Sequence, residues 1–368
     1  MTYLDHGATS FQKPEEVYRA MRCALENCAN PGRGGYTAAM TAAKTVLRCR
    51  EQAAEMFSCQ PEQVVMTANC THGLNIAIHT LVKAGAHVVI SGFEHNAVTR
   101  PLYARGANIK VAGRHLFDWE DTLSTFEDAL KQGVDAAVFT HVSNVFGYIL
   151  PVEQMAALCK QYGVPFVIDA AQSAGMLEIN MEKLGADFIA MPGHKGLLGP
   201  QGTGLLLCGA EPTPLLQGGT GSMSASQEMP DFLPDGLEAG TLNVPGIAGL
   251  SAGMTYVKHQ GIHRIFARQQ QQANRCAKAL EKMGFRVFTG EHQSGTVSFV
   301  PNIDCEVFAE RLGKSGIAVR AGLHCAPLAH ESAGTLDSGT VRISFGHDAA
   351  PWQLGNLLLA VEKMAVQS

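Results

Sequence analysis

Apolar positions along the chain follow two spacings, one typical of helices and one typical of strands. From Glu15 to Ala29 they recur at the spacing of a single helix face, and a second helix is expected from about Thr37 to Phe57. Short apolar runs follow, each bounded by turn-forming residues and each expected to be a strand. These runs are Gln63–Met66, His87–Ile90, Ala136–Thr140, Phe166–Ile168, Phe188–Ala190 and Gly204–Leu207.

The segments between these strands include helices with clear ends. In "PVEQMAALCKQYG", Pro151 stands at the start, Gly163 at the end, and the apolar residues between them share one face. Strands that alternate with such helices indicate βαβ units and a largely parallel sheet. We therefore expect an α/β fold with a large domain over residues 15–245.

The rhythm changes after about Pro245. A long helix is expected first, then strands around "TVSFV", "IAVRAG" and "TVRISFG", with a helix between the first two and a final helix from Trp352. This pattern predicts a smaller α+β domain over residues 246–368, completed by the N-terminal segment 1–14.

Composition excludes several classes of function. Of the 368 residues, 46% are hydrophobic and 17% charged, and the net charge of -5 offers no basic field for nucleic acid. No apolar run approaches a membrane span and the N-terminus does not resemble a secretory signal, so we expect a cytoplasmic protein without a membrane segment. The ten cysteines include no CxxC pair, so we expect mostly buried thiols and no metal site.

One lysine, Lys195, stands among glycines in "MPGHKGLLGPQGTG". Such a lysine could hold a nucleotide phosphate, or it could be a nucleophile that bonds a cofactor covalently. A phosphate-binding loop requires GxxxxGK followed by Ser or Thr, and here Gly196 follows the lysine with no such pattern before it. The covalent alternative predicts a carboxylate at a strand end, an aromatic ring to stack on the cofactor, and a helix N-terminus for a phosphate.

All three features occur just after predicted strands. Asp169 ends a strand in "PFVIDAAQSAG", Thr71 and His72 lie where a strand gives way to a helix in "MTANCTHGLNIAI", and His95 follows a strand in "SGFEHNAVTRP". Taken singly, each has a structural explanation, because Asp169 and Thr71 could be helix caps and a lone histidine is often a core residue. Together they favour a site at the carboxyl edge of a parallel sheet.

A series of motifs carries a resemblance to a known family. The motifs, in order, are "YLDHGAT", "NPGRGGY", "CTHGLN", "EHNAV", "HVSNVFG", "DAAQSAG", "GHKGLLGPQGTG", "EAGT" and "LHCAP". The chain resembles the class V aminotransferase group of enzymes and, within it, the cysteine desulfurases. The resemblance implies a fold-type I homodimer that uses pyridoxal phosphate and L-cysteine and passes sulfur to a thiol or protein acceptor.

The resemblance also assigns roles to individual residues. Lys195 is similar to the Schiff-base lysine, Asp169 to the partner of the pyridine nitrogen, and His95 to the stacking imidazole. Gln172 would neighbour the ring oxygen, and the phosphate would be held by Thr71, His72, His194 and, from a second subunit, Thr241. Asn144 and Arg342 would meet the substrate carboxylate. Because Arg342 lies on an apolar strand, a partner is expected for its charge, unless the side chain extends to solvent from an edge strand.

Cys325 distinguishes a desulfurase from a transaminase. It lies in "RAGLHCAPLAHES", a loop between Gly322 and Pro327 rather than an apolar helix, which suits a thiol that must ionise to attack sulfur. The resemblance implies that it accepts sulfur as a persulfide. Selenocysteine lyase, a plain aminotransferase and a non-catalytic sulfur-transfer partner remain alternatives.

The chain departs from the family pattern at three places. Pro192 stands where a serine or threonine usually helps to hold the phosphate, so that role is expected to rest more on Thr71, His194 and Thr241. His6 and Gly7 replace part of the common "DNAAT", and "SFGHDA" lacks the usual Tyr-Asn. These differences suggest a divergent branch whose substrate could differ from free L-cysteine.

Overall fold

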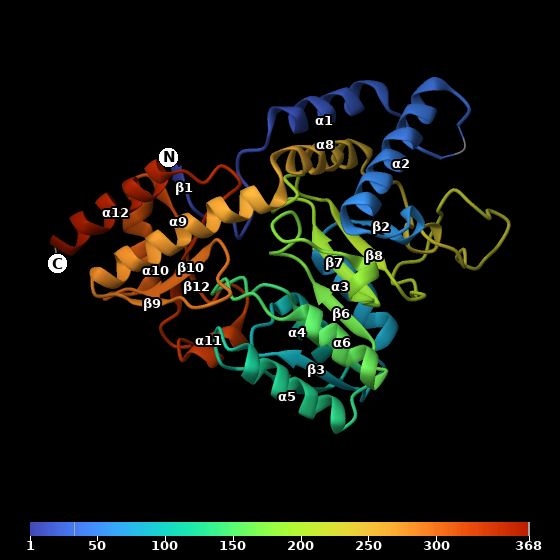
Figure 1. The fold of residues 1–368 in the computed structure, drawn as a ribbon. Helices are drawn as coiled ribbons and strands as arrows, with labels where there is room; N and C mark the ends of the chain where they lie inside the picture. The colour runs from blue at the N-terminus through green and yellow to red at the C-terminus, as the bar shows by residue number, and fades with distance from the viewer. Residues whose placement is uncertain (33, 367–368) are drawn as a thin grey trace.

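Two sheets, one of seven strands and one of four, organise the chain into a larger and a smaller lobe (Figure 1). The computed structural model describes residues 1–32 and 34–366, so Arg33 of the "NPGRGGY" motif lies outside the described residues. Both ends of the chain lie in the smaller lobe (Figure 1). The expected α/β fold with a second α+β unit is confirmed.

The large sheet has the strand order β2-β8-β7-β6-β5-β3-β4. Its strands are β2 (Val64–Thr67), β3 (His87–Ser91), β4 (Asn108–Ala112), β5 (Ala136–Thr140), β6 (Phe166–Asp169), β7 (Phe188–Pro192) and β8 (Gly204–Cys208). The run from β4 to β7 is parallel, whereas β8 is antiparallel to both of its neighbours. The sheet is therefore mainly parallel, as the alternation of strands and helices predicts.

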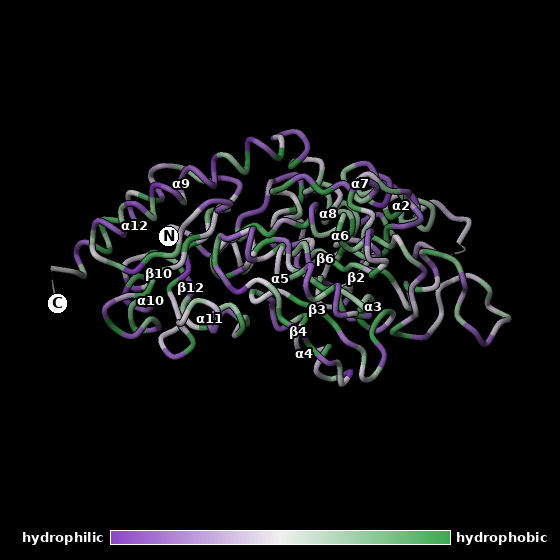
Figure 2. The backbone as a smooth tube through the Cα atoms, turned by 60° about the horizontal axis from the view of Figure 1, so that its bottom comes forward, coloured by the Kyte–Doolittle hydropathy of each residue, from purple (hydrophilic) through white to green (hydrophobic). Residues whose placement is uncertain are grey.

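Helices cover both faces of this sheet, which explains the continuous apolar runs of its strands. The helices α2 (Thr37–Phe57), α5 (Trp119–Lys131) and α6 (Val152–Tyr162) contribute to the core on one face, and α3 (Cys70–Leu81) and α4 (Asn96–Ala104) to the core on the other. Along β5, Ala137 and Phe139 belong to the first core and Ala136 and Val138 to the second. In Figure 2 hydrophobic colour accordingly follows the interior strands.

The smaller lobe is built on an antiparallel sheet with the order β12-β13-β10-β9. Its strands are β9 (Arg286–Phe288), β10 (Thr296–Val300), β12 (Arg320–Gly322) and β13 (Thr340–Ser344), and its helices α9 (Ile262–Lys282), α10 (Cys305–Lys314), α11 (Pro327–Ala333) and α12 (Pro351–Val366). The N-terminal strand β1 (Thr2–Tyr3) pairs with β11 (Ile317–Ala318), and Leu4 enters this lobe's core. The first residues of the chain thus pack with the last third of the sequence.

Two expectations about this region are wrong. The single long helix after Pro245 is two helices, α8 (Val244–Gln260) and α9, because Gly261 adopts φ +80°, outside the helical region. "IAVRAG" is likewise not one strand, since β11 and β12 belong to different sheets.

The limits of the two domains stay a prediction, and the helix contacts favour a shifted boundary. Helix α8 packs against α1 (Glu15–Asn27) and α2 beside the large sheet, whereas α9 packs against β9 and β10. The chain therefore passes from the larger lobe to the smaller lobe at Gly261 rather than at residue 245.

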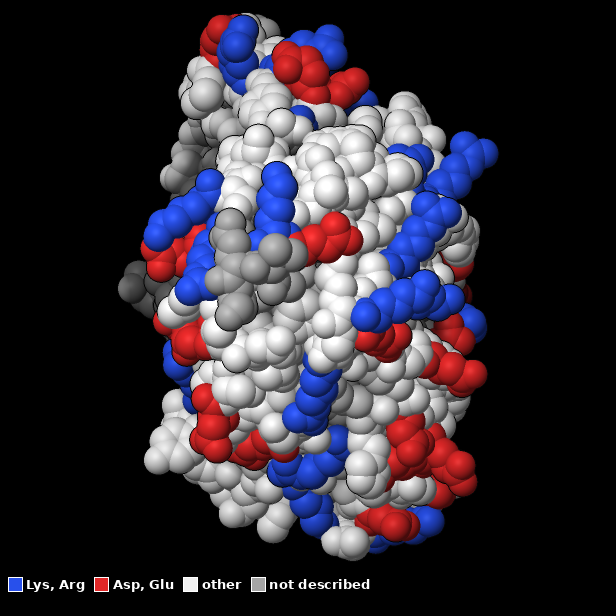
Figure 3. Space-filling model, turned by 90° about the vertical axis from the view of Figure 1, so that its left-hand side faces the viewer, with Lys and Arg blue, Asp and Glu red and all other residues white. Residues whose placement is uncertain are grey.

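Two observations concern the described helices and one face of the surface. None of the described helices combines the length and apolar character that crossing a bilayer requires. On the face drawn in Figure 3, basic and acidic side chains are interspersed rather than separated by sign.

A buried ion pair between Arg50 and Glu238 is expected to stabilise the larger lobe. Both N–O distances are 2.9 Å, Glu238 also accepts from the Met66 N–H at 2.7 Å, and the two side chains are 8% and 7% exposed. Because Glu238→Ala leaves the guanidinium buried without its partner, we expect the free energy of unfolding to fall by about 3 kcal/mol. Urea unfolding of the apoprotein measures this loss. Glu55→Ala, which breaks the exposed Lys258–Glu55 pair, serves as the control and should cost under about 1 kcal/mol; equal losses would contradict the prediction.

Candidate active site

A cavity of about 230 Å³ lies at the carboxyl edge of the large sheet, where ligands of parallel sheets bind. Strand β6 ends at Asp169, and the segments that follow β2, β3, β5 and β7, together with Ala8, supply the other walls. The lining residues are Ala8, Asn69, Cys70, Thr71, His95, Ala97, Thr140, Val142, Asn144, Asp169, Ala171, Gln172, Pro192, His194 and Lys195. The structure thus brings together seven of the residues that the sequence singles out: Thr71, His95, Asn144, Asp169, Gln172, His194 and Lys195.

Lys195 is held in this cavity by the N-terminal segment. The Ser10 hydroxyl donates to the carbonyl oxygens of His194, at 2.9 Å, and of Lys195, at 3.1 Å. The Lys13 ammonium also donates to the His194 carbonyl, at 2.8 Å. Burial lowers the pKa of Lys195, while the nearby Asp169 carboxylate opposes that shift. Burial therefore increases the share of neutral amine, the form that attacks a carbonyl.

Asp169 is fixed through one of its two carboxylate oxygens. Its Oδ1 accepts from the Ala171 N–H at 2.8 Å and lies 3.4 Å from the Cys70 Sγ. The side chain is almost fully buried, at 2% exposure. Asp169 therefore presents a negative charge in a low-dielectric wall, where it acts strongly on a cation in the cavity.

His95 caps helix α4 and presents its ring to the cavity. Its Nδ1 accepts from the Ala97 N–H at 3.0 Å, which fixes the imidazole plane. Burial lowers the pKa of His95, although Asp169 opposes this. A neutral, oriented ring suits stacking against a flat cofactor.

The beginning of helix α3 supplies backbone and hydroxyl donors. Asn69 is its N-cap and accepts from the His72 N–H at 2.9 Å, while Thr71 lines the cavity. His72 does not: its Nδ1 accepts from the Ala68 N–H at 3.3 Å, away from the other site residues. A helix N-terminus with a free hydroxyl is a ready anion site.

The remaining predicted cofactor residues differ in their placement. Gln172 lines the cavity and donates to the Gly7 carbonyl at 2.9 Å, and the His194 Nδ1 lies 3.0 Å from the Thr9 hydroxyl. Pro192 also lines the cavity and offers no donor there. Thr241 lies elsewhere, in a separate hollow that it shares with Arg50 and Glu238.

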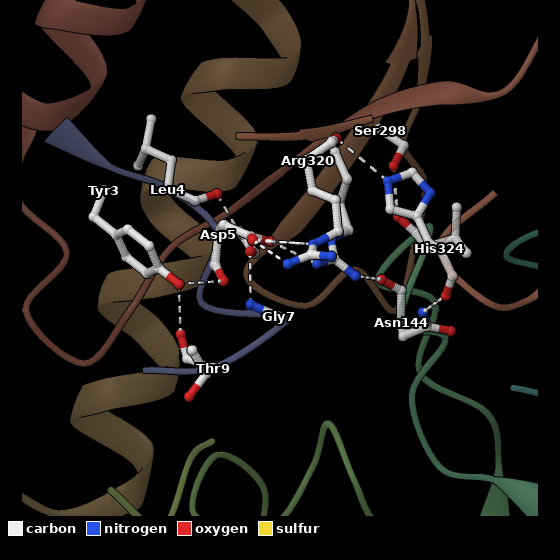
Figure 4. A network of polar contacts seen from close by, with 12 residues as sticks. Tyr3, Leu4, Asp5, Gly7, Thr9, Asn144, Ser298, Arg320 and His324 are labelled. Atoms are coloured by element: carbon white, nitrogen blue, oxygen red, sulfur yellow. Dashed lines mark hydrogen bonds and ion pairs between the residues drawn. The ribbon is translucent and has the colours of Figure 1, made fainter. Parts of the chain in front are cut away.

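Arg342 has the partner that its place on an apolar strand predicts, and that partner is the carboxylate of Asp5. Its Nη2 lies 2.7 Å from Asp5 Oδ1, and its Nη1 donates to the Asn144 carbonyl at 2.9 Å. Asp5 also pairs with Arg320 at 2.9 Å (Figure 4). Arg342 is 2% exposed, so it does not extend to solvent, and its Nε receives no partner among the described residues. Arg342 is not among the cavity's lining residues and reaches its wall through Asn144.

The loop of Cys325 is tied to the same wall. The Asn144 amide donates to the His324 carbonyl at 2.8 Å (Figure 4), and the Asn96 N–H donates to the Cys325 carbonyl at 2.7 Å. Both His324 and Cys325 have left-handed backbones, with φ +53° and +57°. Cys325 is exposed, so its thiol is accessible at the edge of the site.

Sequence reasoning missed four residues that shape the site. Asn69 carries the signal of a helix cap, because an asparagine precedes the helical run. Asp5 lies in a motif that the sequence singles out, but only the fold reveals its pairing with Arg342. Cys70 likewise lies in the quoted motif "CTHGLN", but only the fold reveals its contact with Asp169. Lys13 carries no sequence signal that separates it from ordinary surface residues.

The donor set fits pyridoxal phosphate. The cavity combines a buried amine, a buried carboxylate, a fixed imidazole plane and a helix N-terminus, which match the aldehyde, ring nitrogen, ring face and phosphate of that cofactor. In the described part of the chain, no three His, Cys, Asp or Glu side chains gather as metal ligands would.

The fold and the site together define a fold-type I α/β enzyme, with a lysine loop at the carboxyl edge of a mainly parallel sheet. The sequence pattern of the family described as aminotransferase class-V matches residues 2–356. The chain belongs to this family.

Individual relatives agree with this assignment. A probable cysteine desulfurase of Methanothermobacter thermautotrophicus is 33% identical, over 91% of this chain and 88% of that protein. One of Pyrococcus abyssi is 32% identical, over 93% and 89%. The apo structure of a cysteine desulfurase from Thermococcus onnurineus NA1 is 30% identical with a TM-score of 0.91, covering 100% of this chain and 95% of that one.

The buried carboxyl of Glu94, next to His95, is expected to make stability depend on pH. Burial raises its pKa to about 8, while its Oε1 accepts from the Ser91 hydroxyl at 2.5 Å and the Thr140 N–H at 2.8 Å. Between pH 4.5 and about 8 the folded state keeps the proton on Glu94, whereas the unfolded chain has lost it. The free energy of unfolding is therefore highest below pH 4.5 and falls as the pH rises toward 8. Glu94→Gln should flatten this decline by up to about 1.4 kcal/mol per pH unit.

Unfolding of the apoprotein at several pH values between 5 and 8, roughly the interval between the two pKa values, measures the effect. Glu62→Gln, at an exposed glutamate, is the matched control and should follow the wild type. Parallel profiles for wild type and Glu94→Gln would show that the carboxyl ionises alike in both states.

Thiol reactivity should separate Cys325 from the buried cysteines. Burial raises the pKa of Cys208 and of Cys276 to about 12, so these thiols are both shielded and protonated. Iodoacetamide should therefore modify Cys325 in the native protein well before either of them, as peptide mass spectrometry measures. After denaturation in urea all three should react alike. Native Cys276 reacting as fast as Cys325 would contradict the described packing.

Proposed function

We propose that the chain is a pyridoxal-phosphate-dependent cysteine desulfurase. It would convert L-cysteine to L-alanine, place the sulfur on Cys325 as a persulfide, and pass it to a thiol acceptor. The observation that carries this proposal is the attachment of the exposed Cys325 loop to the lysine cavity through Asn96 and Asn144. A transaminase has no need of a thiol at this place, and the relatives named as cysteine desulfurases support the same activity.

The cavity residues would hold the cofactor as their chemistry dictates. Lys195 would bond it covalently, His95 would stack on its ring, and Asp169 would keep the ring nitrogen protonated by charge. Gln172 would neighbour the ring oxygen, and Thr71 and His194 would hold the phosphate together with the N–H groups of α3. When bound, pyridoxal phosphate withdraws electrons from the substrate Cα.

Lys195 would also move the Cα proton once the substrate amine has displaced it from the cofactor. Burial lowers the pKa of this amine, so its neutral form can accept a proton near neutral pH. Arg342 and Asn144 would orient the substrate carboxylate, since a guanidinium binds both carboxylate oxygens. Asp5 occupies Nη2 of Arg342 and the Asn144 carbonyl occupies Nη1, so Nε is the guanidinium group with no partner among the described residues.

Cys325 would take the sulfur in a balanced transfer. Its thiolate attacks the substrate sulfur, an S–S bond forms, and the C–S bond breaks with its electron pair left on the carbon skeleton. That carbon is then protonated and leaves as alanine. L-cysteine and one enzyme thiol thus yield alanine and one enzyme persulfide. An acceptor thiol then either reduces this persulfide or takes up its outer sulfur.

We further propose a homodimer in the cytoplasm. Thr241 lies outside the cavity of its own chain, which supports a contribution to the phosphate site of the partner subunit. All ten cysteines are free, as is usual in a reducing compartment.

Product analysis with L-cysteine and a reducing thiol tests the proposed activity. The cofactor-loaded wild type should release alanine and sulfide in equal amounts, and Cys325→Ala should lose at least about 100-fold in rate because no nucleophile remains. Cys23→Ala, at the other exposed cysteine, is the control and should keep wild-type activity.

The same assay separates the alternatives. If L-selenocysteine turns over and L-cysteine does not, with Cys325→Ala still active, the enzyme is a selenocysteine lyase. If a keto acid accepts the amino group and no sulfide appears, it is an aminotransferase. Either result would overturn the proposal.

A further inference from the structure

One cysteine other than Cys325 lines the cavity and contacts Asp169, the one carboxylate among the lining residues. Cys70 is the first residue of α3 and lines the cavity beside Lys195. Its Sγ lies 3.4 Å from Asp169 Oδ1, and the residue is 7% exposed. The proposed chemistry uses Cys325 and leaves this thiol without a role.

Cys70 is unsuited to be a nucleophile. Burial raises its pKa well above the usual value of a thiol, and the Asp169 charge acts in the same direction. The thiol therefore keeps its proton. A protonated thiol next to a carboxylate can act in one direction only, with S–H as donor and Asp169 Oδ1 as acceptor.

This contact completes the fixation of one carboxylate oxygen. Oδ1 accepts from the Ala171 N–H at 2.8 Å on one side and faces the Cys70 thiol at 3.4 Å on the other. Oδ2 receives no hydrogen bond from the described residues, and the carboxylate as a whole lines the cavity. Two donors on a single oxygen restrict rotation of the carboxylate and leave the other oxygen for a ligand.

The contact also joins two parts of the site that come from different elements. Cys70 and Thr71 are consecutive at the start of α3, and the Asn69 cap orders that turn. Asp169 ends β6. A bond from Cys70 to Asp169 therefore sets the distance between the anion-binding helix end and the carboxylate.

We propose that Cys70 is a positioning residue for pyridoxal phosphate. Its thiol holds Asp169 so that Oδ2 meets the ring nitrogen while the adjoining Thr71 meets the phosphate of the same molecule. The inference rests on the proposed cofactor and adds a residue to its site. It assigns Cys70 no part in sulfur transfer.

Titration of the apoprotein with pyridoxal phosphate, followed by protein fluorescence, tests this role. Cys70→Ala should weaken binding about threefold to fivefold, as loss of one hydrogen bond of about 1 kcal/mol would. Cys208→Ala is the matched control, because Cys208 is a buried thiol of the same apolar core that does not contact Asp169. It should bind like the wild type, and Cys70→Ser, which restores a donor, should recover most of the affinity.

A double-mutant cycle distinguishes positioning from general packing. In an Asp169→Ala background, Cys70→Ala should cause no further loss, because the thiol then has no carboxylate to hold. An additive loss, an equal loss in Cys208→Ala, or no recovery in Cys70→Ser would overturn the inference. Urea midpoints of all variants show whether each is folded; if Cys70→Ala is not, Cys70→Val and Cys70→Ser provide the comparison.

The wild type separates failure of this inference from failure of the proposed function. If it forms no visible absorption band with pyridoxal phosphate, or if Lys195→Ala forms the same band, the proposed cofactor site is wrong. If the wild type binds through Lys195 and Cys70→Ala binds equally well, only the role of Cys70 is wrong.

Discussion

Arg342 is a permanently charged group enclosed in the protein, and its burial constrains three segments that are far apart in the sequence. A guanidinium at 2% exposure would be very costly without a partner, and Asp5 from the N-terminal segment supplies the opposite charge at 2.7 Å. The Asn144 carbonyl of the larger lobe supplies a second acceptor. The N-terminus, the smaller lobe and the larger lobe are therefore joined at one point, which is also a wall of the site.

The contacts of Asp5 and Asn144 with Arg342, together with the rest of the N-terminal segment, help to position both proposed reactive groups, the Cys325 thiol and the Lys195 amine. Asp5 also pairs with Arg320, which begins the short strand β12 before the Cys325 loop, and Asn144 holds that loop through the His324 carbonyl. Farther along the N-terminal segment, Ser10 donates to the carbonyl oxygens of the lysine loop. The thiol and the amine are thus positioned by the same fourteen or so N-terminal residues, although neither lies near them in sequence.

Local patterns predicted most of the larger lobe, because buried parallel strands and amphipathic helices each leave a simple spacing. Edge strand β4 was missed since it is half exposed and its run "NIKVA" is interrupted by a lysine. The site residues at strand ends were predictable for a similar reason: Asp169 ends β6, and parallel strands place such positions at one edge. The partners that fix these residues were not predictable from the sequence. The pairs Asp5–Arg342 and Cys70–Asp169 join residues that are far apart in the chain, and no local pattern indicates their contact.

Two of the three departures from the family pattern, those in "LDHGAT" and "SFGHDA", lie together in space. The His6 ring packs over Gly346, where any Cβ would overlap with the imidazole. A Cβ added at Gly7 would lie 3.1 Å from the Arg342 Cζ and would crowd the guanidinium. Burial lowers the pKa of His6 to about 4, against the opposing effect of Asp348, so the ring is neutral near pH 7. His6, Gly7 and Gly346 line a small cavity of about 30 Å³ that Lys195 also lines. The changes in "LDHGAT" and "SFGHDA" therefore alter the shape of this wall while preserving the charges on which the proposed chemistry depends.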